Sequence, residues 1–155
     1  MQKTIITNNI KETKSLGEKI ARCLKPGDNV ALVGELGSGK TTFTKGIAKG
    51  LSIKNPEYVN SPSFVLIREY EGRVSLYHFD LYRLERLEDI EYMGIQEYLG
   101  GKGVVVIEWA EKLGHLTPNE YLKVDIDIKG KEKRRFRFTP YGKRYSDIIS
   151  RYLRG

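Results

Sequence analysis

The first half of the chain alternates between helical and extended hydrophobic patterns. A short strand is expected over residues 4–7. Apolar residues at helical spacing then predict a helix over 10–24, with Asn9 as its N-cap. Asn29–Val33 is an apolar run between turn signals, which is typical of a buried strand. A glycine-rich stretch separates this strand from a second helix, expected over 41–51.

The second half predicts two hairpins and one more buried strand. Residues 64–70 and 74–79 flank a Glu-Gly-Arg turn and predict a hairpin, and a helix is expected over 87–99, before a Gly-Gly pair. The apolar run 104–107 predicts a second buried strand. The remaining expected elements are strands over 122–128 and 134–138 and a closing helix over 145–153.

This order of elements is that of an α/β protein. A mostly parallel central sheet with antiparallel additions accommodates a crossover unit followed by two hairpins. The 155 residues fit a single domain spanning 1–155, with no interdomain linker or repeat.

Composition and charge limit the cellular compartment and the binding partners that are compatible with the sequence. One cysteine, Cys23, excludes an intramolecular disulfide and fits a reducing compartment. The N-terminus lacks the apolar segment of a signal peptide, and the longest apolar run is too short to span a bilayer, so a cytoplasmic protein with no membrane partner is expected. The net charge of +7 is concentrated toward the C-terminus, and it fits either an acidic partner such as RNA or a solvated basic surface.

The glycine-rich stretch carries the strongest chemical signal. Residues 34–41 match the phosphate-loop pattern G-x-x-x-x-G-K-[ST] without a mismatch, between a predicted strand and a predicted helix. We therefore expect a P-loop nucleotide-triphosphatase fold with helices on both faces of the sheet. The expected nucleotide-binding residues here are Gly34, Glu35, Leu36, Gly37, Ser38, Gly39, Lys40, Thr41 and Thr42.

The residue types explain how such a loop binds phosphate. Glycines at 34, 37 and 39 leave room for backbone N–H groups to approach phosphate oxygens, and the helix N-terminus adds its dipole. Lys40 supplies a cation for the β- and γ-phosphates, and the Thr41 hydroxyl is placed to ligate Mg²⁺.

Carboxylates end two predicted strands and are candidates for the metal and for the attacking water. Glu108 follows the apolar run 104–107, and Asp80 follows the strand over 74–79. We assign Glu108 to Mg²⁺ and Asp80 to orienting the attacking water, although the residues alone leave the reverse assignment open. His78 shares a strand face with Asp80 and is interpreted as structural. Trp109 either covers the site or is a core or partner-facing aromatic residue.

Five segments together resemble one known family. GELGSGKTT (34–42), SPSF (61–64), HFDLYRL (78–84), EYMGI (91–95) and VIEWAE (106–111) occur in this order and resemble the bacterial TsaE (YjeE) family. The resemblance implies a small ATPase that hydrolyses ATP slowly by itself. It further implies binding to the TsaB–TsaD heterodimer and a role in threonylcarbamoyladenosine formation in tRNA.

The resemblance also implies roles for single residues. Thr41 and Glu108 match the family's Mg²⁺ ligands, Asp80 matches a residue needed for hydrolysis, and Trp109 matches a tryptophan near the nucleotide. Asn9, in the segment entering the first helix, and Arg134, in the C-terminal hairpin, are expected near the nucleotide. Ser63 stands where the family usually has Thr, which keeps the hydroxyl.

Two other functions remain open at this stage. In a small-molecule or nucleoside kinase, Asp80 would act as a base on the acceptor, but no arginine-rich lid segment is visible. In an RNA-binding module, Phe136, Phe138 and Tyr141, interleaved with arginines, would form a stacking surface, although alternation makes at least some of them core residues.

Overall fold

One mixed sheet organises the protein. The computed structural model describes residues 1–60 and 67–153, and within them seven strands pair in the order β1-β7-β6-β2-β5-β4-β3. The four central strands β6, β2, β5 and β4 are parallel, and β7, β1 and β3 are added antiparallel. The strands are β1 (Lys3–Thr7), β2 (Asn29–Val33), β3 (Ile67–Tyr70), β4 (Leu76–Asp80), β5 (Val104–Glu108), β6 (Tyr121–Ile128) and β7 (Arg134–Tyr141).

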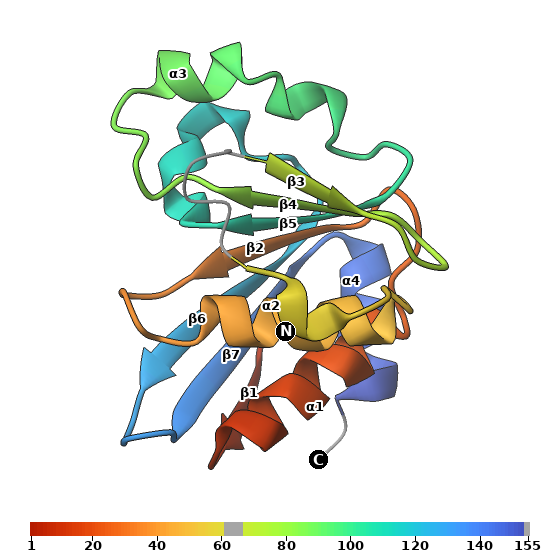
Figure 1. Cartoon of the computed structure of the whole chain (residues 1–155), viewed down its shortest axis with the longest axis vertical. Coiled ribbons are helices and arrows are strands. Elements are labelled where there is room, and N and C mark those ends of the chain that lie inside the picture. The colour runs from red at the N-terminus through yellow and green to blue at the C-terminus, as the bar shows by residue number, and fades with distance from the viewer. Residues whose placement is uncertain (61–66, 154–155) are drawn as a thin grey trace.

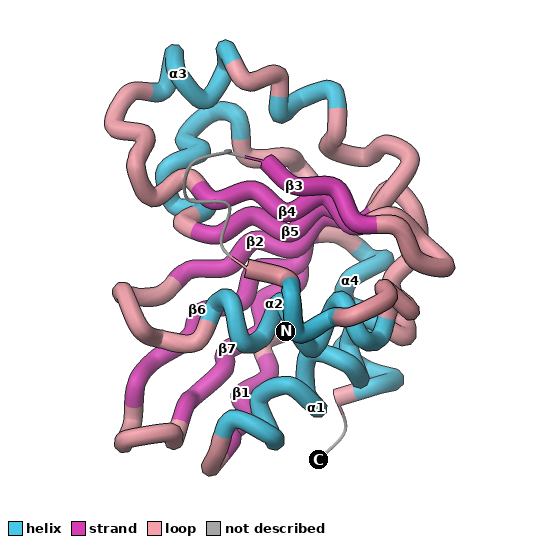
Figure 2. The backbone as a smooth tube through the Cα atoms, viewed as in Figure 1, coloured by secondary structure: helices cyan, strands magenta, loops and turns pink. Residues whose placement is uncertain are grey.

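Helices cover both faces of this sheet, as the sequence predicts (Figure 1). On one face, α1 (Ile10–Ala21), α2 (Lys40–Gly50) and α4 (Lys143–Tyr152) share a core with the central strands. On the other face, α3 (Leu87–Tyr92) and the 3₁₀ turns Ile95–Glu97 and Ala110–Leu116 cover β4 and β5. Figure 2 shows the parallel strands stacked side by side between these layers. A further 3₁₀ turn, Pro56–Tyr58, follows α2.

Strand alternation explains why the sheet needs two layers. All five residues of β5 are buried, because Val104 and Val106 face the core under α1 and α2 while Val105 and Ile107 face the opposite core. A strand buried on both faces reads as a continuous apolar run, the pattern of a central parallel strand. The alternation also turns Glu108, at the end of β5, to the face that carries α2.

Glycines allow α1 and α2 to pack with their backbones close together. A Cβ atom added at Gly46 would lie 2.2 Å from the carbonyl oxygen of Lys14, and one added at Gly17 would lie 2.5 Å from the carbonyl oxygen of Phe43. Side-chain rotation cannot relieve a collision with backbone. The position of α2, and with it the loop that precedes α2, is therefore set by direct backbone contact with α1.

Polar contacts attach α4 to the start of β2. The Arg144 guanidinium donates to both carboxylate oxygens of the buried Asp28, at 3.2 and 2.8 Å. The backbone N–H of Asn29 donates to the Tyr145 hydroxyl at 2.8 Å. Burial raises the pKa of Tyr145 to about 12, and the hydrogen bonds to Asp28 raise the pKa of Arg144.

One expectation from the sequence is wrong. The helix expected over 87–99 ends early, because Gly94 adopts a left-handed conformation with φ of 72° between α3 and the turn Ile95–Glu97. Phe136 and Phe138 are fully buried against Phe43, as strand alternation predicts for part of the aromatic set, so they cannot offer a base-stacking surface; Tyr141 is 40% exposed. The 61–64 segment lies outside the described residues. Among the described helices, none has the length and apolar character needed to cross a membrane.

Candidate active site

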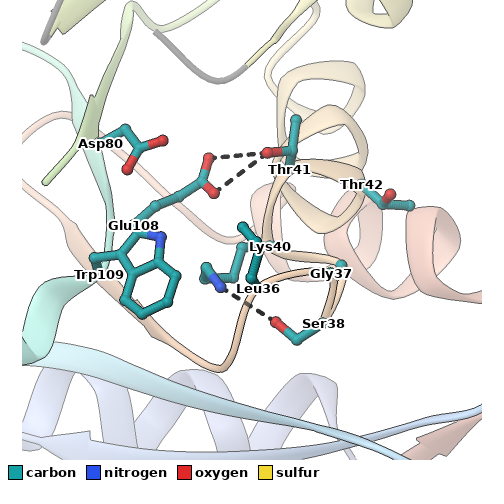
Figure 3. A pocket seen from close by; sticks show the side chains of 10 residues that line it. Leu36, Gly37, Ser38, Lys40, Thr41, Thr42, Asp80, Glu108 and Trp109 are labelled. Atoms are coloured by element: carbon teal, nitrogen blue, oxygen red, sulfur yellow. Dashed lines mark hydrogen bonds between the residues drawn. The ribbon is translucent and has the colours of Figure 1, made fainter. Parts of the chain in front are cut away.

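The phosphate-loop residues and the two predicted carboxylates line one cavity. Its volume is about 290 Å³, and it lies beyond the carboxyl ends of β2, β4 and β5 (Figure 3). Ligands of open parallel sheets bind at this edge. The lining residues are Leu36, Gly37, Ser38, Gly39, Lys40, Thr41, Thr42, Asp80, Glu108 and Trp109.

The loop conformation depends on its glycines. Gly37 and Gly39 have φ values of 81° and 103°, which side chains rarely adopt. Gly34 is required by space, since a Cβ atom there would lie 2.6 Å from the Ser38 Oγ atom and 2.8 Å from the Ile126 carbonyl oxygen. The loop ends at Gly39, and Lys40 and Thr41 open α2. Their side chains therefore lie at the helix terminus that carries positive partial charge.

Lys40 holds its ammonium group inside the loop. Its Nζ donates to the carbonyl oxygen of Glu35 at 2.9 Å and to that of Gly34 at 2.5 Å, and it lies 4.3 Å from the centre of the Trp109 ring. Burial lowers the pKa of Lys40, and the nearby carboxylates, Glu108 first among them, oppose that shift. A cation held in this way is attracted to any anion that enters the loop.

Thr41 and Glu108 meet across the cavity. The Thr41 hydroxyl donates to the Glu108 carboxylate, with separations of 3.2 and 3.3 Å to its two oxygens. Glu108 is buried, and its Oε2 atom lies 2.5 Å from Nε2 of the fully buried His78. The contact places Glu108, of the two predicted carboxylates, beside the hydroxyl that the loop motif offers to a metal (Figure 3).

Asp80 is held next to this pair but in a different way. It stands opposite Glu108 in the register of β4 and β5, and its Oδ1 atom accepts a hydrogen bond from the Tyr82 backbone N–H at 2.9 Å. Asp80 is also buried and lines the same cavity. Two carboxylates on neighbouring strands therefore face the cavity, and the Thr41 hydroxyl donates to Glu108.

Trp109 closes one side of the cavity. Its backbone is left-handed, with φ of 60°, an uncommon conformation for a bulky residue that stores strain. The ring packs against Tyr82 at 5.0 Å between centroids and over the Lys40 ammonium. Of the positions that the sequence left open, the structure combines two: Trp109 lines the cavity and also packs against the core on the α3 side of the sheet.

Arg134, at the start of β7, contacts the phosphate loop. It donates to the carbonyl oxygens of Ser38 at 2.8 Å and Gly37 at 3.2 Å, and also to three carbonyl oxygens of its own hairpin. Its guanidinium therefore ties the loop to the β6–β7 hairpin.

Asn9 is used by the helix cap, as its sequence context predicts. Its Oδ1 atom accepts from the Glu12 backbone N–H at 2.8 Å. Next to it, a second cavity of about 130 Å³ adjoins the loop, and it is lined by Ile10, Thr13, Gly37, Gly39, Thr42, Lys131, Glu132 and Arg134. Ile10 belongs to the segment entering the first helix, which was expected near the nucleotide. No motif marks Thr13, Lys131 or Glu132, because only the fold brings α1 to the hairpin.

The donor set at Thr41 and Glu108 suits a hard divalent cation. Mg²⁺ prefers oxygen ligands and usually takes only one or two from the protein, with phosphate oxygens and water completing the octahedron. Within the described ranges, no group of three or more His, Cys, Asp or Glu residues is arranged to hold a metal by itself. Thr41 and Glu108 thus supply the one or two protein oxygens that Mg²⁺ usually takes.

A glycine-rich loop between a central parallel strand and a helix, facing a carboxylate on the neighbouring strand, defines the P-loop class of α/β proteins. A family model described as "Threonylcarbamoyl adenosine biosynthesis protein TsaE" matches residues 7–136 of this chain. The chain belongs to the TsaE family.

Individual relatives agree with this assignment. The tRNA threonylcarbamoyladenosine biosynthesis protein TsaE of Bacillus subtilis (strain 168) is 45% identical over 149 residues, covering 96% of this chain and 92% of that protein. The protein of the same name from Aquifex aeolicus (strain VF5) is 38% identical, covering 87% of this chain and 94% of that protein. The crystal structure of YdiB from Bacillus subtilis is similar with a TM-score of 0.82 at 37% identity, covering 99% of this chain and 95% of that chain.

Proposed function

We propose that this protein is a Mg²⁺-dependent ATP hydrolase of the cytoplasm, built as a single domain over residues 1–155. It binds and slowly hydrolyses ATP and supports the TsaB–TsaD complex in threonylcarbamoyladenosine modification of tRNA. The observation that carries the proposal is the contact between Thr41 of the phosphate loop and the buried Glu108 carboxylate, within one cavity that also holds Lys40 and Asp80.

The loop residues bind the triphosphate. Backbone N–H groups around Gly37 and Gly39 approach phosphate oxygens, and the N-terminus of α2 adds a favourable field. Lys40 exchanges its carbonyl partners for β- and γ-phosphate oxygens, which neutralises charge where the bond breaks. Because Arg134 donates to two carbonyl oxygens of the loop, its role is to maintain the loop conformation, from the wall of the cavity beside α1 that it also lines.

Thr41 and Glu108 hold Mg²⁺, directly or through its water shell. When bound, the ion neutralises charge that develops on the phosphate oxygens. Asp80, on the adjacent strand, orients the attacking water and accepts its proton. Trp109 covers the Lys40 side of the cavity and limits the access of bulk water there.

The nucleoside extends toward the cavity beside α1. Thr42 lines both this cavity and the loop cavity, so a nucleotide that follows the loop passes from one to the other. Ile10 offers an apolar side chain for the base, and Asn9 acts by capping the helix that carries it.

Two exposed side chains, one lining the main cavity and one packed against Trp109 of its wall, support an action through a protein assembly. Leu36, at the tip of the phosphate loop, is 70% exposed, and Tyr82, beside Trp109, is 46% exposed. A partner that covers Leu36 and Tyr82 buries apolar surface and excludes water from the cavity in one step. That arrangement makes hydrolysis slow in the isolated chain and dependent on TsaB–TsaD.

Two measurements test the proposal. Purified protein with Mg²⁺ and ATP is expected to release phosphate to water without an acceptor, whereas a phosphorylated nucleoside product would establish the kinase alternative. The TsaB–TsaD pair is expected to co-purify with the chain, to an extent that differs between ATP and ADP. If no association occurs with either nucleotide, the assembly role is wrong while the hydrolase proposal stands.

A further inference from the structure

His78 is a fully buried histidine whose hydrogen bonding is directed at one carboxylate. Its Nε2 atom lies 2.5 Å from Oε2 of Glu108, and the other ring nitrogen, Nδ1, has no hydrogen-bond partner among the described residues. Burying a polar ring nitrogen without a partner costs free energy, so an apolar residue would suit the core better at this position. The contact with Glu108 is the interaction that offsets this free-energy cost.

The strand register shows that the contact depends on the length of the glutamate. In the parallel pair of β4 and β5, Glu108 stands opposite Asp80, and His78 stands two residues earlier, opposite Val106. The Glu108 side chain therefore turns back along β4 to reach His78, while its carboxylate still accepts from Thr41 on α2. An aspartate, one methylene shorter, would not span both partners.

The two contacts fix the carboxylate from two sides. An ionised carboxylate only accepts hydrogen bonds, so the tautomer of His78 that supports it is the one with Nε2–H. The Thr41 hydroxyl approaches from the loop side and His78 from within the sheet, which leaves the carboxylate little rotational freedom. A ligand that is orientated before the metal arrives loses less entropy when the metal binds.

We propose that His78 is a positioning residue, which holds the Glu108 carboxylate in the orientation that binds Mg²⁺ beside Thr41. The inference rests on the proposed Mg²⁺-nucleotide function and adds a residue to it. It also accounts for glutamate in place of the aspartate that usually ends this strand in P-loop proteins. Loss of an outer-shell partner typically costs 10–100-fold in metal affinity or activity, which sets the size of the expected effect.

The test separates metal binding from nucleotide binding. Trp109 is the only tryptophan and lies on the cavity wall, so its fluorescence reports ADP binding with EDTA and then the Mg²⁺ titration of the ADP complex. For His78→Leu, the half-saturating Mg²⁺ concentration is expected to rise at least ~10-fold, with ADP affinity in EDTA within ~2-fold of the wild type. His78→Gln, which keeps an N–H near the Nε2 position, is expected to stay within ~3-fold in both measurements.

Controls make each result decisive. The other histidine, His115, is exposed and pairs with Glu91 on the surface, so His115→Leu is expected to leave the Mg²⁺ titration unchanged. If His78→Leu lowers ADP affinity in EDTA as much as it raises the Mg²⁺ requirement, the residue has a general structural role and the proposal fails. An unchanged Mg²⁺ titration also overturns it. If the wild-type protein and His115→Leu both bind ADP but show no response to Mg²⁺, the proposed Mg²⁺-dependent function fails, and the proposed role of His78 fails with it.

Discussion

The contact between Arg134 and the phosphate loop separates two explanations for a basic residue near a nucleotide. If the residue acts by charge, a lysine replaces it. If it acts by geometry, a lysine fails, because one ammonium cannot reach two loop carbonyls and three hairpin carbonyls at once. The structure favours geometry, since the guanidinium donates to the carbonyls of Gly37 and Ser38.

The two hydrogen bonds to the loop set the magnitude. Hydrogen bonds from charged donors contribute about 1.5–3 kcal/mol each when buried, and Arg134 is half-buried, so we take ~1 kcal/mol for each. The loop without its clamp must then be ordered by the nucleotide, at a cost of ~2 kcal/mol, or a ~30-fold weaker affinity for ATP. Arg134→Lys and Arg134→Gln are both expected to weaken ATP binding by ~10–30-fold.

Titration calorimetry with ATP and Mg²⁺ at low and high salt checks this prediction. Arg135→Lys is the matched control, because the neighbouring side chain pairs with Asp127 and makes no measured hydrogen bond to the loop. If Arg134→Lys binds ATP within ~3-fold of the wild type at low salt while Arg134→Gln is much weaker, the geometric explanation is refuted and charge is the cause.

Four further predictions follow from single contacts. Lys40→Ala is expected to abolish nucleotide binding, so tight ATP binding by the variant would contradict the loop assignment. Asp80→Ala is expected to bind ATP and stop phosphate release, and loss of Mg²⁺-dependent binding instead would exchange its role with that of Glu108. Gly46→Ala is expected to lower the free energy of unfolding in urea by ~1–3 kcal/mol, because collision with the α1 backbone outweighs the better helix propensity; equal or higher stability would contradict that packing. Burial raises the pKa of Tyr145 from 10.0 to about 12, so the folded state favours the protonated hydroxyl. The free energy of unfolding of the wild type should therefore fall between pH 10 and 12 by up to ~2.7 kcal/mol, an upper limit that solvent screening reduces. A pH series of urea unfolding should show this loss in the wild type and not in Tyr145→Phe.

Short sequence motifs predicted the parts of the site that are built from residues adjacent in the sequence. The phosphate loop needs glycines and a lysine at fixed spacing, so Gly34 to Thr41 identified it before any fold was known. The buried strand Asn29–Val33 was predicted with its observed ends, because turn residues bound an apolar run on both sides. Carboxylates at strand ends were predicted as candidates for the same reason.

Contacts between distant segments were beyond those patterns. The sequence placed His78 and Asp80 on one face, yet only the register of β4 against β5 shows that Glu108 reaches back to His78. The helical pattern over 87–99 continued through Gly94, whose left-handed backbone breaks the helix in a way that periodicity does not record. Arg134 was expected near the nucleotide, and only its hydrogen bonds to Gly37 and Ser38 show that it also holds the loop.

The contacts that complete the site join residues that lie far apart in the sequence. Thr41 meets Glu108 across 67 residues of sequence, and Arg134 meets Ser38 across 96. Contacts of such long range are formed only after much of the backbone entropy has been lost, and parallel pairing makes them slow. During synthesis the phosphate loop therefore leaves the ribosome well before β7, the strand that carries Arg134. We expect ATP binding to appear together with the cooperative folding of the whole sheet, and a nascent chain that ends before β7 to lack it.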